Sequence, residues 1–204
     1  MKALFAATAV LGLVLAGAAS AEPRQVSGFT GVDASSGAEV EITIGQAYSV
    51  DVSGPGAQRI ITEVQGNVLR VHPQQTWGFS VRRRALVRIT MPSLNSLGAS
   101  SGAQVRAEGV RAADISLDAS SGGDLTIAGT CRSVTADASS GAHLNAAHLV
   151  CERGTVDASS GGRADVNVNG NLDVDASSGG NVYAGGGAQI GSISLSSGGT
   201  LRRS

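Results

Sequence analysis

The sequence predicts an all-β protein folded as a single-stranded parallel β-helix with roughly 19 to 20 residues in each coil. Three observations support this fold class. The motif Asp-Ala-Ser-Ser-Gly recurs seven times in identical or similar form, apolar and polar residues alternate around each copy, and the chain has 29 Gly but only 3% aromatic residues. Such a composition cannot fill a core with large rings, so small and β-branched side chains must stack in a regular lattice.

The spacing of the motif copies gives the period of the fold. From Gly98 to Ser194, successive copies begin 20, 19, 20, 18 and 19 residues apart, which is the length of one solenoid coil. A leucine-rich horseshoe has a similar period but needs leucines and an asparagine at fixed offsets, which these repeats lack. The copies begin at Asp33, Gly98, Asp118, Asp137, Asp157, Asp175 and Ser194. A nucleophilic serine is needed once per active site, so this repetition indicates architecture.

Each motif copy is expected to form one corner of a coil. The residue before the motif and the second residue of the motif are apolar in every copy, and these positions are predicted to point inward. By strand alternation, the first residue and the first serine then face outward, and the glycine permits the turn. A second short alternating strand follows, as in residues 124–127.

The organisation of the chain is predicted from its N-terminus onward. Lys2, an apolar run over residues 3–18 and the small residues 19–21 have the pattern of a cleavable signal peptide, residues 1–21. One β-helix domain, 22–204, is expected to follow, with irregular first coils in 22–97 and regular coils in 98–204. Export places the mature chain in the periplasm or outside the cell, at its surface, and no transmembrane segment is expected in it.

The net charge argues against two classes of partner. Without Lys2, the mature chain has 14 Arg against 16 acidic residues, a net charge of −2. This balance does not predict binding to nucleic acid or to anionic membranes in general.

The layout of the chain resembles a known family. Residues Phe29-Thr30-Gly31-Val32 are followed by a strand pair, then by residues 67–71 (NVLRV) and 87–94 (VRITMPSL), and then by serine-glycine coils. This layout resembles the putative auto-transporter adhesin head family, also called the GIN domain, over essentially all of the mature chain. The resemblance implies a right-handed parallel β-helix at an exported or surface location. It carries no catalytic signature.

A column of aspartates is the first candidate site. Successive members should lie about 4.8 Å apart, one coil from the next, and like charges at that distance repel. Serine hydroxyls and turn amides that hydrogen-bond the carboxylates give a structural interpretation. The alternative is a calcium site, since calcium accepts several oxygen ligands in a loose arrangement; no other cofactor is expected. The column comprises Asp118, Asp137, Asp157 and Asp175.

The two cysteines are predicted to form a disulfide. Cys131 and Cys151 each lie six residues before a motif aspartate, so they should stack in adjacent coils at a separation that a disulfide accepts. Export supplies the oxidising environment. The alternative is a pair of buried, reduced thiols.

A basic and aromatic segment is the third candidate. Its rings could stack on sugars and its guanidinium groups could pair with carboxylates or phosphates of an anionic glycan or lipid head group. The alternative is a solvated strand face whose charges prevent edge pairing. The ligand-loop residues are Trp77, Phe79, Arg82, Arg83 and Arg84, with Arg88 nearby.

The sequence therefore predicts an exported, non-catalytic, adhesin-like binding module whose partner is a glycan or another envelope component. A scaffold whose coils stack end to end is the first alternative. A polysaccharide-acting β-helix enzyme is the second, because Asp137, Asp157 and Arg163 could imitate the acidic and basic groups of pectin-degrading enzymes. The scattered histidines do not predict a catalytic triad.

Overall fold

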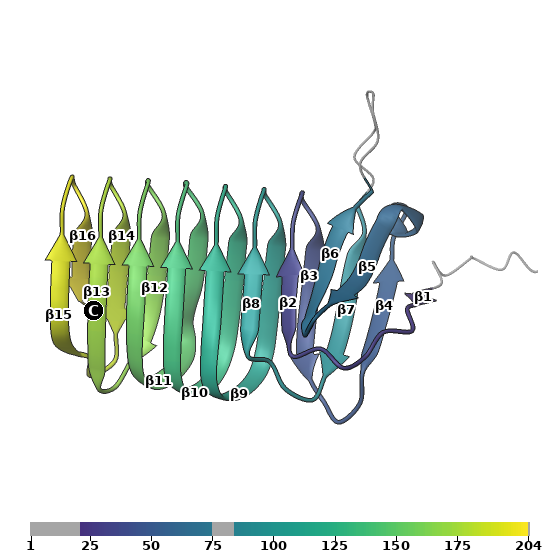
Figure 1. The fold of residues 1–204 in the computed structure, drawn as a ribbon, viewed down its shortest axis with the longest axis horizontal. Helices are drawn as coiled ribbons and strands as arrows, with labels where there is room; N and C mark the ends of the chain where they lie inside the picture. Colours follow the sequence, from purple (N-terminus) through teal and green to yellow (C-terminus); the bar gives the residue numbers. More distant parts are fainter. Residues whose placement is uncertain (1–20, 75–83, 204) are drawn as a thin grey trace, which may run out of the picture.

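The computed structural model describes residues 21–74 and 84–203, and the chain is all-β, as predicted. It forms a β-solenoid of about 5 turns, elongated along the stacking direction (Figure 1). One short 3-10 turn, η1 (Ala57–Arg59), accompanies the strands. The strands are β1 (Glu22–Pro23), β2 (Gly31–Ala34), β3 (Glu39–Ile44), β4 (Ser49–Ser53), β5 (Ile60–Gln65), β6 (Val68–Pro73), β7 (Leu86–Met91), β8 (Ser96–Ala99), β9 (Gln104–Ala119), β10 (Asp124–Ala138), β11 (His143–Ala158), β12 (Arg163–Val168), β13 (Asn171–Ala176), β14 (Asn181–Gly185), β15 (Gln189–Leu195) and β16 (Thr200–Arg203).

The coils form two facing layers. Layer A has the order β1-β4-β7-β3, then the first parts of β9, β10 and β11, then β12-β14-β16. Layer B has the order β5-β6-β2-β8, then the second parts of β9, β10 and β11, then β13-β15. Each of the strands β9 to β11 bends from layer A into layer B. In later coils, two separate strands form the two layers, and the bend lies between them. From β2 and β3 onward, neighbouring strands in each layer are parallel.

Strand alternation builds the core between the layers. In β9, Val105 and Ala107 from layer A and Ile115 and Leu117 from layer B are all buried, while Arg106 and Ser116, which alternate with them, face solvent. The predicted inward positions beside each motif are buried through Val174 and Ala176. In the final coil these positions hold Ile193 and Leu195, which are 52% and 46% exposed because the described chain has no coil beyond them.

The motif corners are two-residue turns that the sequence predicted only in part. In the first copy, the N–H of Ala38 donates to the carbonyl of Ser35 at 3.2 Å, and both residues between them have positive φ, 58° for Ser36 and 76° for Gly37. This is the pattern of a type I′ turn. The sequence indicates only that the glycine permits the turn, but the second serine of all seven copies also adopts the left-handed conformation.

Hydrogen bonds between neighbouring turns support four of these left-handed serines, Ser140, Ser160, Ser178 and Ser197. The N–H of Gly122 donates to the carbonyl of Ser140 in the next coil at 3.2 Å, and the same bond recurs from Gly141, Gly161 and Gly179. The last five turns are therefore linked by hydrogen bonds, and the turns line one edge of the solenoid (Figure 1). Each bond offsets part of the cost of placing a non-glycine residue at positive φ.

The N-terminal part departs from simple winding. Strand β2 lies between β6 and β8, and β3 lies between β7 and β9, so the first motif copy stacks beside the second although residues 45–94 separate them. Outside these coils, β4 is antiparallel to β7, β1 is antiparallel to β4, and β5 is antiparallel to β6. Antiparallel strands therefore cover this end of the parallel stack.

Candidate functional site

The aspartate column forms as predicted on the outer surface of layer B. Parallel register pairs Asp118 with Asp137, Asp137 with Asp157, and Asp157 with Asp175. The column ends at Ser194. We call these four aspartates the ladder.

A fifth carboxylate lies across a gap at the other end of the ladder. Gly98 pairs with Asp118 on one side and with Asp33 on the other. A side chain at Gly98 would meet the carboxylate of Asp33, since an added Cβ would lie 2.8 Å from its Oδ1. Glycine therefore leaves room for the Asp33 carboxylate beside the ladder.

The surroundings of two ladder carboxylates destabilise their ionised form. Burial and the neighbouring Asp33 raise the pKa of Asp118 above its usual 3.8. Burial, together with Asp157 and Asp118, raises the pKa of Asp137. Both shifts show that the environment disfavours the ionised form.

Among the described residues, the ladder offers no preformed group of ligands for calcium. Across residues 21–74 and 84–203, no three His, Cys, Asp or Glu side chains are grouped so that they could hold a metal ion. The ladder carboxylates lie in a row, and calcium requires six or more oxygens around one point.

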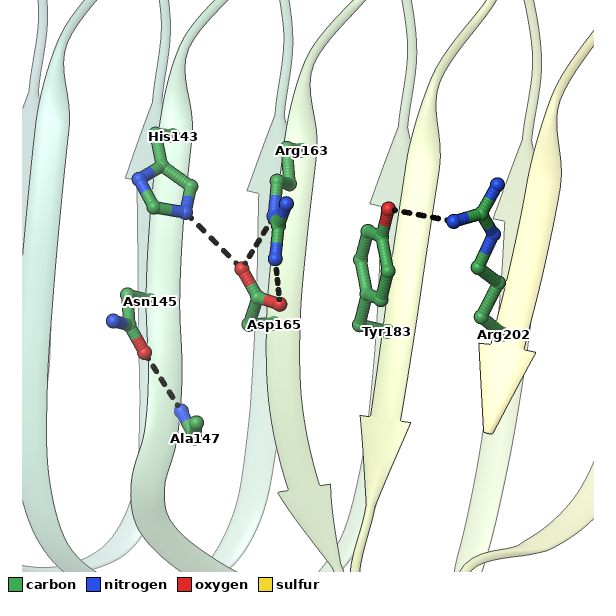
Figure 2. A network of polar contacts seen from close by, with 7 residues as sticks. All are labelled: His143, Asn145, Ala147, Arg163, Asp165, Tyr183 and Arg202. Carbon is green, nitrogen blue, oxygen red and sulfur yellow. Dashed lines mark hydrogen bonds and ion pairs between the residues drawn. The ribbon is translucent and has the colours of Figure 1, made fainter. Parts of the chain in front are cut away.

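A second constellation, which the sequence interpretation missed, lies on the outer surface of layer A (Figure 2). Asp165 of β12 accepts hydrogen bonds from Nε and Nη2 of Arg163, both at 2.8 Å, and from Nε2 of His143 at 3.1 Å. Its side chain is only 15% exposed, whereas those of His143 and Arg163 are 43% and 47% exposed. The carboxylate is thus shielded beneath two half-exposed cationic or polar groups.

Tyr183 extends this constellation toward the C-terminus. The guanidinium carbon of Arg163 lies 4.0 Å from the Tyr183 ring centroid, and that of Arg202 lies 5.6 Å from it. Nη1 of Arg202 also reaches the Tyr183 hydroxyl at 3.5 Å. An aromatic ring between two guanidinium groups is a cation–π arrangement. We call His143, Arg163, Asp165, Tyr183 and Arg202 the network.

The carboxylate of the network is stabilised in its ionised form, unlike the Asp118 and Asp137 carboxylates of the ladder. Burial alone would raise the pKa of Asp165, but the hydrogen bonds from Arg163 and His143 hold it below 3.8. The same hydrogen bond raises the pKa of Arg163. Two arginines against one aspartate leave the network cationic, and its outward groups are donors and one ring. This set suits hydroxyls, carboxylates and the flat face of a sugar.

The sequence did contain a signal for the network. His143 and Arg163 are the first residues of successive strands in layer A, while Asp165, Tyr183 and Arg202 are third residues, each one coil from the next. Aligning the repeats by outward position would have brought them together. Arg163 was instead grouped with Asp137 and Asp157, which lie on the other layer, so the structure does not assemble the predicted enzyme-like set.

The cysteines form the predicted disulfide. Cys131 and Cys151 are register partners in β10 and β11, with Cα atoms 4.5 Å apart. Both side chains are at least nine-tenths buried. A hollow beside them, lined by Arg111, Arg132 and Glu152 among others, is open to solvent. The pair is structural.

The predicted ligand loop is described only at its end. Trp77, Phe79, Arg82 and Arg83 lie outside the described residues, so their role stays a prediction. Arg84 is exposed, and its carbonyl accepts the N–H of Gly56 at 3.2 Å. Arg88 lies on layer A and pairs with Glu41 at 3.1 Å, as expected for a solvated strand face.

With the geometry established, comparison with known proteins identifies the family. The family model described as "Putative auto-transporter adhesin, head GIN domain" matches residues 28–188. The chain belongs to this family. Among curated proteins, no sequence matches the chain.

One solved structure shows the same fold as this GIN-domain chain. A "putative adhesin" from Bacteroides fragilis NCTC 9343 is 18% identical, with a TM-score of 0.72 over 91% of this chain and 96% of that one. A "putative lipid binding protein" from Parabacteroides distasonis ATCC 8503 is 16% identical, with a TM-score of 0.49 over 93% of this chain and 98% of that one. At such identities, the first likeness establishes the fold of the GIN domain and nothing further.

Proposed function

We propose that this protein is an exported, non-catalytic surface module that holds an envelope glycan without turning it over. The observation that carries the proposal is the network on layer A. It combines an aromatic ring with two arginines on an open strand face. Rings stack on sugars, and guanidinium groups pair with hydroxyls, carboxylates or phosphates.

The regularity of the solenoid supports an extended ligand. Outward positions repeat about every 4.8 Å along the stack, and the faces are long. Thr126, Asn145, Asp165, Tyr183 and Arg202 follow one another along one row of layer A. A polysaccharide lying along this row would meet polar side chains before it reaches the ring.

Location supports an envelope partner. The N-terminal sequence predicts export, and the family is described as an adhesin head. No helix within the described residues is long and apolar enough to span a membrane. Envelope polysaccharides are accessible to a protein in the periplasm or at the cell surface.

Binding of mature protein, residues 22–204, to a glycan array and to envelope fractions tests the proposal. We expect Tyr183→Ala and Arg202→Ala to weaken binding by about tenfold each, because each removes one strong contact. Thr135→Ala is the control, since Thr135 is exposed on layer B, away from this row, and its loss should leave binding unchanged.

Further arms separate the alternative sites. Trp77→Ala and the double variant Arg83→Ala/Arg84→Ala test the predicted loop, and calcium chelation tests the ladder. If the loop variants alone abolish binding, the site lies there and not on layer A. Wild-type protein that binds no glycan and no envelope component would refute the binding-module proposal.

A further inference from the structure

The last coil of the solenoid ends differently in its two layers. Among the described strands, β15 pairs only with β13, and β16 pairs only with β14, so each presents one unpaired edge. Three large apolar side chains of the described chain are exposed, and two of them, Ile193 and Leu195, are on β15. Their counterparts one coil earlier, Val174 and Ala176, are 3% and 0% exposed.

The edge in layer A is protected by charge. Arg203 occupies a position in register with inward-facing Ala184. Its Nη2 donates to the carbonyl of Ala188, before β15, at 2.6 Å. Arg202 lies beside it and faces outward with Tyr183. Inward and flanking charges on an edge strand oppose pairing with another strand.

The edge in layer B lacks this protection. Strand β15, with the sequence QIGSISL, is seven residues long and carries no charged side chain. The ladder stops one strand earlier, because Ser194 occupies the position that Asp175, Asp157 and Asp137 hold in preceding coils. An uncharged strand rich in β-branched and apolar residues is prone to pair edge to edge.

We infer that β15 is a self-association surface, on which a second copy of this chain pairs antiparallel about a two-fold axis at Ser194. In this register, Ile193 of each copy lies opposite Leu195 of the other. The exposed apolar side chains of both copies are therefore covered. An isologous contact of this kind closes on itself and gives pairs.

Electrostatics favours this partner over other occupants. The two Asp175 carboxylates would be separated by both β15 strands, about 14 Å at the usual strand spacing, which exceeds the screening length at physiological salt. Had the ladder continued through residue 194, two carboxylates would face each other at the axis. A head-to-tail contact would instead require the opposite end of the solenoid, where antiparallel strands cover the parallel coils.

A cysteine cross-link at the axis tests the register. Ser194→Cys places two thiols on directly opposed residues, whose Cα atoms lie about 4.5 to 5.5 Å apart in an antiparallel pair, within disulfide range. The native cysteines are already bonded to each other, so the new thiol is free. Gln189→Cys is the matched control: it is exposed on the same strand, but its copies would lie about 30 Å apart.

We expect mature wild-type protein to show a concentration-dependent dimer by analytical ultracentrifugation, and Ser194→Cys to cross-link much faster than Gln189→Cys under mild oxidation. Ile193→Lys should raise the dimer dissociation constant by about a hundredfold, because it sets two like charges in a small apolar contact. Thr126→Lys adds the same charge in mid-stack and should leave the constant unchanged.

Three results would overturn the inference. The first is wild-type protein that stays monomeric at the highest soluble concentration. The second is a dimer that survives Ile193→Lys, which would place the contact elsewhere. The third is equal cross-linking of both cysteine variants, or filaments in place of pairs. Ligand binding does not enter these measurements, so the outcome is independent of the proposed glycan function.

Discussion

Asp165 on layer A and Asp137 on layer B both stand on the wall of the same solenoid, yet their surroundings shift their pKa values in opposite directions. Asp165 accepts three hydrogen bonds from Arg163 and His143, and its pKa is lowered. Asp137 lies between Asp118 and Asp157, and burial and these neighbours raise its pKa. In this regular stack, the outward carboxylate is stabilised where the residues of neighbouring coils differ from it, and destabilised where they repeat it.

Repetition itself explains the difference. At the ladder position of layer B the same residue returns in successive coils, so like side chains become neighbours in register. In layer A the third strand position changes from Thr126 to Asn145, Asp165, Tyr183 and Arg202, so complementary groups meet. A repeated corner therefore places like carboxylates side by side. Complementary contacts such as those of the network form only where the outward residues differ between coils.

The largest expected effect comes from breaking the corner on which both layers depend. Ala138 is 1% exposed beside the turn that follows the Asp137 position. Ala138→Arg forces a charge and a long chain into this narrow space, so we expect a loss of about 4 kcal/mol or more in the free energy of unfolding. Chemical denaturation measures it. Ala113→Arg, at an exposed position, is the control, and an unchanged midpoint for Ala138→Arg would contradict the assigned inside and outside.

The disulfide should come next. Cys131 and Cys151, 20 residues apart, join the two coils that carry Asp137 and Asp157. Its reduction should lower the free energy of unfolding by about 3 kcal/mol on the chain-entropy account. Denaturation with and without reductant measures this, and the double variant Cys131→Ala/Cys151→Ala should not respond to reductant. Two free thiols in the denatured, unreduced protein would show that the bond does not form.

Removing the network carboxylate should have a smaller effect. Asp165→Ala leaves Arg163 and His143 without their shared acceptor. We expect a loss of about 1 to 2 kcal/mol, because both donors are about half exposed and recover water as a partner. Asp124→Ala, on the same layer at an exposed position, should change stability by no more than about 0.5 kcal/mol. Equal effects of the two variants would show that the network contributes no stability.

These effects divide between what the sequence predicted and what it did not. The corners, the inward positions beside each motif, the ladder and the disulfide follow from the 20-residue repeat, because residues one period apart become register neighbours. The network depends on outward residues that no motif repeats. The hydrogen bonds between neighbouring turns, which support four of the left-handed serines, involve two coils, and a single repeat does not contain them.

The placement of the first motif copy was also beyond a local interpretation. Strand β2 pairs with β6 and β8, so residues 45–94 must fold back before the register is complete. The interval from Asp33 to Gly98 gives no sign of this contact, because it is not one period long. Pairing between strands so distant in sequence is decided by closure of the intervening chain and by packing.

The smallest effect is the pH dependence of the two carboxylates, which sharpens the comparison directly. Asp137→Asn removes a carboxylate whose pKa is raised in the folded state. At neutral pH, the variant should therefore be more stable than wild type. We expect a gain of only a few tenths of a kcal/mol, because Asp137 is exposed enough for water to screen the repulsion. A smaller or absent gain for Asp124→Asn is the control.

The sign of each pH effect follows from the direction of the pKa shift. Folded wild type binds a proton at Asp137 at higher pH than the unfolded chain does, so the advantage of Asp137→Asn should shrink as pH falls through the raised pKa toward 3.8. The lowered pKa of Asp165 gives the opposite case: its stabilisation is complete above 3.8 and is lost only as pH falls further. Between pH 7 and 3, the denaturation midpoint of Asp137→Asn should therefore approach that of wild type while the pH is still above 3.8, and that of Asp165→Ala should do so only below 3.8. If the advantage of Asp137→Asn grew on acidification, or the deficit of Asp165→Ala vanished above 3.8, the opposite shifts of Asp137 and Asp165 would be wrong.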